Sequence, residues 1–168
     1  SPLLMEDLDL LARPISYITA EVQSNDGKAH QVLLSLGAST DLATNTNAQE
    51  VSAKVFTANG LSLSKAGTTE QAILKKKGDD LRIDWGYLYV ATAAGKQVHQ
   101  YISDQSKPFQ VNASTQKTGK KLTLHTLVNL DAVSSKPKTQ VLMLGYDDLF
   151  AVQYFGQNLR PWWNNSGT

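Results

Sequence analysis

The sequence has no cysteine among its 168 residues, and this absence removes three kinds of site at once. A disulfide scaffold, a thiolate zinc site and a cysteine nucleophile all need the missing side chain. A chain of this length can bury about 70% of its extended surface, so it needs no metal or disulfide to fold. The absence does not identify the compartment, because many exported proteins also lack cysteine.

An excess of one charge and long hydrophobic runs are also missing. The chain has 16 basic and 15 acidic residues, a balance that argues against a nucleic-acid partner. No apolar run approaches the ~20 residues of a membrane-spanning helix, so we expect no membrane insertion. The segment Ser1–Asp7 is no signal peptide, and it does not begin with methionine. We expect residues 1–168 to form a single domain excised from a larger multidomain protein.

Alternation of apolar and polar residues, the period of β-strands, is abundant. It predicts strands at 18–22, 32–38, 51–56, 61–63, 81–92, 97–103, 122–130, 140–145 and 149–155. Asn59-Gly60 is a strong hairpin signal. Thr68 and Gln71 could form a capping box, with Gly78 ending a short helix. The pattern predicts an all-β, antiparallel β-sandwich of the supersandwich kind, with room for one short helix.

Charge and aromatic surface are concentrated in residues 78–89. If this stretch is a strand, Asp80, Arg82 and Asp84 share one face, and Trp85 lies on the apolar face. Residues four apart on a strand lie about 13 Å apart. Two-carboxylate glycoside hydrolysis needs about 5–9.5 Å, so this pair is too widely spaced. The arginine favours charged carboxylates, which indicates structural or interface use of these four residues.

Aromatic residues gather again near the C-terminus, where two of the three tryptophans lie. Chain ends usually fray unless they dock on something, and Trp and Arg are favoured interface anchors. The candidate interface residues here are Tyr154, Gln157, Asn158, Arg160, Trp162 and Trp163. Three interpretations stay open: contact with another domain, packing against the domain's own sheet, and stacking of a sugar.

The motifs of catalytic and cofactor sites are scarce. His30, His99 and His125 share no metal-ligand spacing, and a metal site would require them to converge in space. His125 is expected to point outward from its strand. The serines lack the setting of a nucleophile elbow, and the glycines form no phosphate-binding loop. We therefore expect no catalytic residue, no metal ligand and no cofactor in this chain.

Residues 78–89 and 154–162 closely resemble the N-terminal β-rich domain of the glutaminase A family, found in fungi and gut Bacteroides. Ser1–Leu4 and Arg13–Ile18 are similar to the beginning of the same domain. The resemblance implies a secreted or periplasmic parent that hydrolyses L-glutamine to L-glutamate and ammonia. It also implies a partner: a larger catalytic helical domain of the same polypeptide, similar to the six-hairpin toroids of glycoside hydrolases. No catalytic residue is carried over, because nothing matches a serine–lysine or cysteine nucleophile.

Three functions compete at this point. The first is an accessory β-sandwich domain that supports the catalytic domain of a glutaminase-like amidohydrolase. The second is a carbohydrate-binding or carbohydrate-processing module, because similar sandwiches accompany toroidal glycosidases. The third is a stand-alone hydrolase, which requires a concave pocket where carboxylates and a histidine meet.

Overall fold

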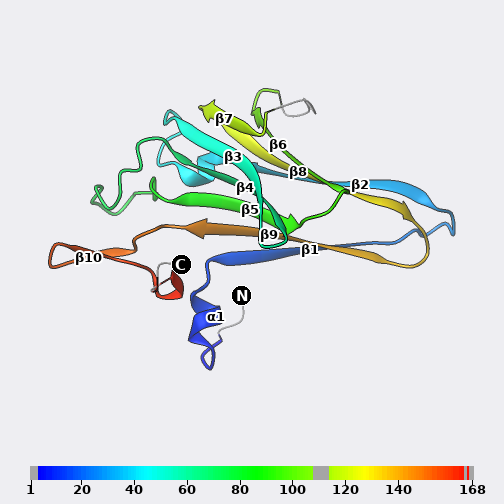
Figure 1. Cartoon of the computed structure of the whole chain (residues 1–168), viewed down its shortest axis with the longest axis horizontal. Coiled ribbons are helices and arrows are strands. Elements are labelled where there is room, and N and C mark those ends of the chain that lie inside the picture. Colours follow the sequence, from blue (N-terminus) through cyan, green and yellow to red (C-terminus); the bar gives the residue numbers. More distant parts are fainter. Residues whose placement is uncertain (1–3, 108–113, 165, 167–168) are drawn as a thin grey trace.

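The fold consists of two facing antiparallel sheets, seen in a computed structural model that describes residues 4–107, 114–164 and 166 (Figure 1). The larger sheet has six strands in the order β1-β9-β5-β4-β3-β7, and the smaller has three in the order β2-β8-β6. The strands of the larger sheet are β1 (Ile15–Val22), β9 (Lys138–Asp147), β5 (Tyr87–Ala93), β4 (Leu61–Thr68), β3 (Val51–Ala58) and β7 (Gln116–Gly119). Those of the smaller sheet are β2 (His30–Ser39), β8 (Leu122–Val133) and β6 (Val98–Asp104). The predicted all-β sandwich is confirmed.

Apolar side chains fill the space between the two sheets in two clusters. The larger cluster contains Ala38, Ala43, Val51, Ala53, Ala66, Leu88, Val90, Ile102, Leu122 and Leu124. The smaller contains Val128, Leu130, Val133 and Leu142. Most of these residues come from the alternating segments, because every second side chain of a strand points to the same face. The alternation thus supplies one buried face for each sheet.

The hairpin between β3 and β4 has the predicted turn. Asn59 and Gly60 have φ angles of 50° and 75°, and a type I′ turn needs positive φ at both central residues. The turn pairs Ala58 with Leu61 and fixes the register of the whole hairpin. The same register places Phe56 opposite Leu63 and Lys54 opposite Lys65, on the sheet face that points away from the core.

Short elements extend from the sandwich near β1 and β9 (Figure 1). Helix α1 (Leu8–Ala12) begins after Asp7, whose carboxylate accepts a hydrogen bond from the Leu10 amide at 2.9 Å. β10 (Val152–Tyr154) and β11 (Gln157–Leu159) form a separate hairpin. Two 3-10 turns, η1 (Thr40–Ala43) and η2 (Trp162–Asn164), complete the fold. Within the described residues, no helix is long and apolar enough to cross a membrane.

The prediction of a strand beginning at Leu81 is wrong for its first half. Residues 78–86 form an irregular loop, and β5 begins at Tyr87. Gly78 and Gly86 have φ angles of 135° and 78°, which a continuous strand does not allow. A Cβ at Gly86 would lie 2.1 Å from the Asp147 carbonyl oxygen, so β9 passes too close for any side chain there. Asp80, Arg82 and Asp84 therefore do not share a strand face.

Two further expectations about elements need correction. Residues 69–77 form no helix, because Gln71 and Leu74 have φ angles of 48° and 53°. The capping interaction itself is present: the Gln71 amide donates to Thr68 Oγ1 at 3.2 Å, but the chain turns away afterwards. The expected strand at 149–155 is only three residues long, Val152–Tyr154, and pairs with β11 instead of joining a main sheet.

Candidate functional site

The outward face of the six-stranded sheet carries a broad apolar groove of about 570 Å³. The strand registers place the outward side chains in cross-strand rows: Ile15 lies in a row with Gly145 and Tyr89, and Tyr17, just outside the groove, lies in the row of Met143 and Ala91. The groove is lined by Pro14, Ile15, Asn59, Leu61, Leu63, Tyr89, Ala91, Met143, Gly145, Tyr146, Asp147, Trp163 and Asn164. Most of these residues are apolar, with a few polar groups at the margins.

A lysine lies over two tyrosine rings beside this groove. Lys65 Nζ is 3.4 Å from the centroid of the Tyr87 ring and 5.5 Å from that of Tyr89. Burial, with a smaller contribution from Lys54, lowers the pKa of Lys65. Burial also raises the pKa of Tyr89 to about 12, so its hydroxyl is neutral at physiological pH. The lysine is therefore a partly desolvated cation on an aromatic surface.

The two ends of the described chain meet at one margin of the groove. Trp163 lines the groove, and its neighbour Trp162 donates from Nε1 to Asp9 Oδ1 at 2.9 Å. Leu8, Leu11, Ala12 and Trp162 enclose a second apolar hollow of about 220 Å³. Trp162 nevertheless remains 60% exposed. Its contact with α1 is thus part of an open surface rather than of a core.

The other C-terminal candidates lie on the β10–β11 hairpin or next to it. Tyr154 is 62% exposed, and Gln157 pairs with it across the hairpin. Asn158 accepts a hydrogen bond from the Gln153 side chain at 3.1 Å. The Arg160 guanidinium lies 5.5 Å from the Phe150 ring centroid. All four candidates are exposed.

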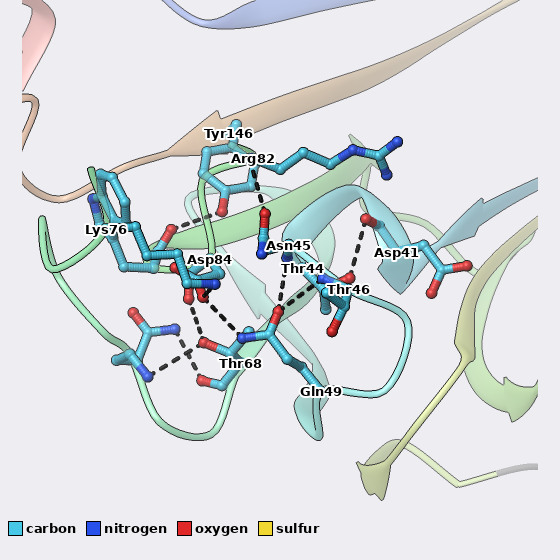
Figure 2. A network of polar contacts seen from close by, with 12 residues as sticks. Asp41, Thr44, Asn45, Thr46, Gln49, Thr68, Lys76, Arg82, Asp84 and Tyr146 are labelled. Carbon is cyan, nitrogen blue, oxygen red and sulfur yellow. Dashed lines mark hydrogen bonds and ion pairs between the residues drawn. The ribbon is translucent and has the colours of Figure 1, made fainter. Parts of the chain in front are cut away.

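Asp84, whose polar contacts are drawn in Figure 2, differs from the other charged residues of its segment, because it is only 1% exposed. Lys76 Nζ lies 2.5 Å from Asp84 Oδ2, and Gln49 Nε2 donates to the same oxygen at 2.8 Å. Gln49 Oε1 in turn accepts from the Asn45 amide at 2.7 Å. The carboxylate therefore joins two parts of the 69–86 loop and links them to the loop that precedes β3.

The remaining candidates of that segment separate in space. Asp80 and Arg82 are exposed, and Arg82 contributes its backbone amide to Asn45 Oδ1 at 3.1 Å (Figure 2). Trp85 is 9% exposed and donates from Nε1 to the Phe150 carbonyl at 3.1 Å. The Trp85 carbonyl accepts from the Tyr146 hydroxyl at 2.7 Å, and burial raises the pKa of that hydroxyl. Asp84 and Trp85 thus belong to the framework of the domain.

His125 lies on the outward face of β8, opposite the face of the core residues Leu122 and Leu124, as expected, but it is not exposed to solvent. It is 6% exposed, and its ring stacks on that of Tyr101 with 4.5 Å between centroids. Its Nε2 lies 2.9 Å from Ser103 Oγ, and burial lowers its pKa. Alternation gives the face of His125 but does not show that Tyr101 of the neighbouring strand β6 packs on its ring.

The hollows described here bring few titratable side chains together. Among the described residues, no group of three or more His, Cys, Asp or Glu side chains could hold a metal ion. The large groove has one carboxylate, Asp147, among its lining residues. A further hollow of about 410 Å³ is lined by Asp41, Leu42, Arg82, Ile83 and Tyr146, again with a single carboxylate and no histidine.

Sequence reasoning found Trp162 and Trp163 but missed the groove beside them. Leu63, Tyr89 and Met143 line this groove, and each lies on a strand whose other face fills the core. Residues 140–145 have apolar side chains on both faces, and this pattern could have indicated the groove, because it is typical of a strand that is covered on both sides. Which strands would lie side by side was not evident from the sequence.

The family model described as "Domain of unknown function (DUF5127)" matches residues 1–168. No curated protein matches the sequence significantly.

Proposed function

The chain belongs to the DUF5127 family over its whole length, and we propose that it is a non-catalytic accessory domain of a glutaminase-like hydrolase. In this proposal it packs against a catalytic helical domain of the same polypeptide. The parent is proposed to be secreted or periplasmic and to hydrolyse L-glutamine to L-glutamate and ammonia. The proposed substrate and cellular location rest on the resemblance of residues 78–89 and 154–162 to the glutaminase A family.

The observation that carries the proposal is the open apolar face of the six-stranded sheet. Its groove of about 570 Å³ continues through Trp163 to the exposed Trp162 and helix α1. Contiguous exposed apolar surface of this kind marks interaction sites in soluble proteins. An antiparallel sheet normally has one solvated face that is polar, whereas here the second face is also apolar in its centre.

The chemistry of the described residues also supports a binding role. A hydrolase site needs a nucleophile or activated water near a base, with donors for the developing charge. His125 is engaged with Ser103, and His30 Nε2 contacts Asp26 Oδ1 at 2.9 Å on another part of the surface. Neither histidine lines one of the hollows described above.

Two measurements test the proposal together. The isolated 168-residue chain should not turn over glutamine, whereas the full-length parent should. Hydroxyl-radical footprinting should show less oxidation of Tyr17, Met143 and Trp163 in the parent than in the isolated chain. Leu33, 61% exposed on the smaller sheet, is the control and should be oxidised equally in both. Glutamine turnover by the isolated chain, or unchanged footprints, would contradict the proposal.

Carbohydrate binding is the second candidate, and a specific observation favours it. Tyr89 and Trp163 line the groove together with the polar side chains of Asn59, Asp147 and Asn164. Aromatic rings beside amides and a carboxylate are groups that can stack on and hydrogen-bond to a sugar. Titration with a panel of oligosaccharides should then change tryptophan fluorescence, and Trp163→Ala should abolish the change. A flat response across the panel would remove this candidate.

A further inference from the structure

The β10–β11 hairpin projects from the body of the domain without a sheet beneath it (Figure 1). Residues 151–160 are all exposed. A two-stranded hairpin by itself is marginally stable in water, because it has no second layer to cover its apolar side chains. This one is held at its base by the Ala151 amide, which donates to the Leu159 carbonyl at 2.9 Å.

The hairpin is amphipathic. Its register pairs Val152 with Leu159 and Tyr154 with Gln157, so these four side chains share one face. Val152, Tyr154 and Leu159 are 50%, 62% and 40% exposed. Gln153 and Asn158 lie on the opposite face and hydrogen-bond to each other at 3.1 Å. One face is therefore polar and hydrogen-bonded, while the other carries Val152, Tyr154 and Leu159 beside Gln157 and is uncovered.

The tip of the hairpin is both aromatic and strained. Phe155 and Gly156 occupy the turn with φ angles of 44° and 79°. Asn, Asp and Gly are preferred at the first of these positions, and a bulky side chain at positive φ is unfavourable. Phe155 is 89% exposed, and its ring meets that of Tyr154 edge to face with 4.5 Å between centroids. The contact with Tyr154 lies within the hairpin itself, so it leaves the Phe155 ring exposed.

From these observations we propose that the hairpin is a docking arm that inserts Phe155 and Tyr154 into an apolar pocket of the neighbouring catalytic helical domain. The inference rests on the function proposed above. The arm has no charged residue between Val152 and Leu159. We therefore expect it to bind through apolar contacts, with the side-chain amides of its Gln and Asn residues at the edge of the contact. It leads through Arg160 and Pro161 directly into Trp162 and Trp163 of the proposed docking surface.

The size of the arm favours a partner tethered in the same polypeptide over a second copy of the chain. Two aromatic side chains bury about 150–250 Å² each. A free protein partner needs about 800 Å² on each side, which the arm does not supply. A tethered domain is present at an effective concentration in the millimolar range, so a small anchor suffices to orient it.

Photo-crosslinking in the full-length parent tests the arm. The photoreactive residue p-benzoylphenylalanine replaces Phe155 in one variant, Trp162 in a second and Leu33 in a third. We expect positions 155 and 162 to cross-link to peptides of the helical domain within a single polypeptide, while position 33 does not.

The other outcomes separate the two proposals. A link at 162 with none at 155 would overturn the arm and leave the docking surface standing. Absence of links at both positions would overturn the arm and the proposed function together. A product of doubled mass at 155 would show that a second copy receives the aromatic tip, which also contradicts the tethered partner.

Discussion

Asp84 links the 69–86 loop to the loop before β3 from a position that is 1% exposed. Breaking a buried ion pair is costly because it leaves an uncompensated charge, although the Lys76 side chain is 31% exposed and regains some hydration. We expect Asp84→Asn to lower the free energy of unfolding by about 2 kcal/mol. Urea denaturation with an unchanged m-value measures the loss. Asp80→Asn, in the same loop but exposed, should change stability by less than about 0.5 kcal/mol, and equal effects would contradict the role of Asp84.

His125 makes the stability of the sandwich sensitive to acid. Burial lowers its pKa, so the unfolded state takes up a proton at a pH where the folded state is still neutral. This contribution to stability is complete above the unfolded pKa of about 6.5 and is lost as pH falls toward the folded pKa. The resulting slope is at most about 1.4 kcal/mol per pH unit.

Unfolding curves measured between pH 7.5 and 5 check this expectation. His125→Gln keeps a nitrogen donor near Ser103 but does not titrate, so its stability should depend less on pH in that window. His99→Gln, at an exposed position on β6, is the control and should retain the wild-type slope. A wild-type slope in His125→Gln would show that the acid sensitivity arises elsewhere.

At the scale of the element, the strain in the β10–β11 turn predicts whether a substitution there raises or lowers the stability of the hairpin. Phe155→Asn places a residue preferred at positive φ in the turn and removes a side chain that is 89% exposed. The hairpin of the isolated chain should become more stable by about 0.5–1 kcal/mol. Amide hydrogen exchange at Ala151 should slow accordingly, because this amide closes the base of the hairpin.

A second substitution in the same turn should have the opposite effect. Gly156→Ala adds a Cβ at a φ of 79°, where open space surrounds the glycine, so only the backbone conformation is penalised. Exchange at Ala151 should then become faster than in the wild type. If both substitutions speed exchange, Phe155 makes a stabilising contact within the isolated domain and the strain argument is wrong.

The secondary-structure elements also show which parts of the fold the sequence patterns predict and which they do not. Alternation predicted β1, β2, β3, β8 and β9, because each strand has one face in the core. It failed at 78–86, where charged and apolar residues alternate in a loop fixed by Asp84 and by the close approach of Gly86 to β9. Such tertiary contacts leave no periodic signal. Helix α1 was missed because five residues are too few for a helical period to be recognised.

At the scale of the whole molecule, the sandwich has one closed interior and one open apolar face. Tyr17, Tyr89 and Trp163 of that face come from β1, β5 and η2, which are far apart in sequence, so only the fold shows that they lie on one side. The sequence therefore predicted an interface at the C-terminal tryptophans but not the groove that they border. The resemblance of two local blocks suggested a partner domain, while the sheet suggests where the partner would lie.

The open face leads to a prediction about how the parent protein unfolds. Tyr17 is 61% exposed on edge strand β1, so Tyr17→Lys should change the stability of the isolated chain by less than about 0.5 kcal/mol. In the full-length parent, the same change places a charge in the proposed interdomain contact. We expect calorimetry to show one coupled transition for the wild type and two separate transitions for the variant.

Leu33→Lys provides the matched control, because Leu33 is also 61% exposed but lies on β2 in the smaller sheet. It should leave the coupled transition of the parent intact. If both variants uncouple the transitions, the added charge acts through general destabilisation and not through the outer face. If neither does, the partner domain lies against another surface, and the open sheet face is then free to bind a ligand such as a carbohydrate.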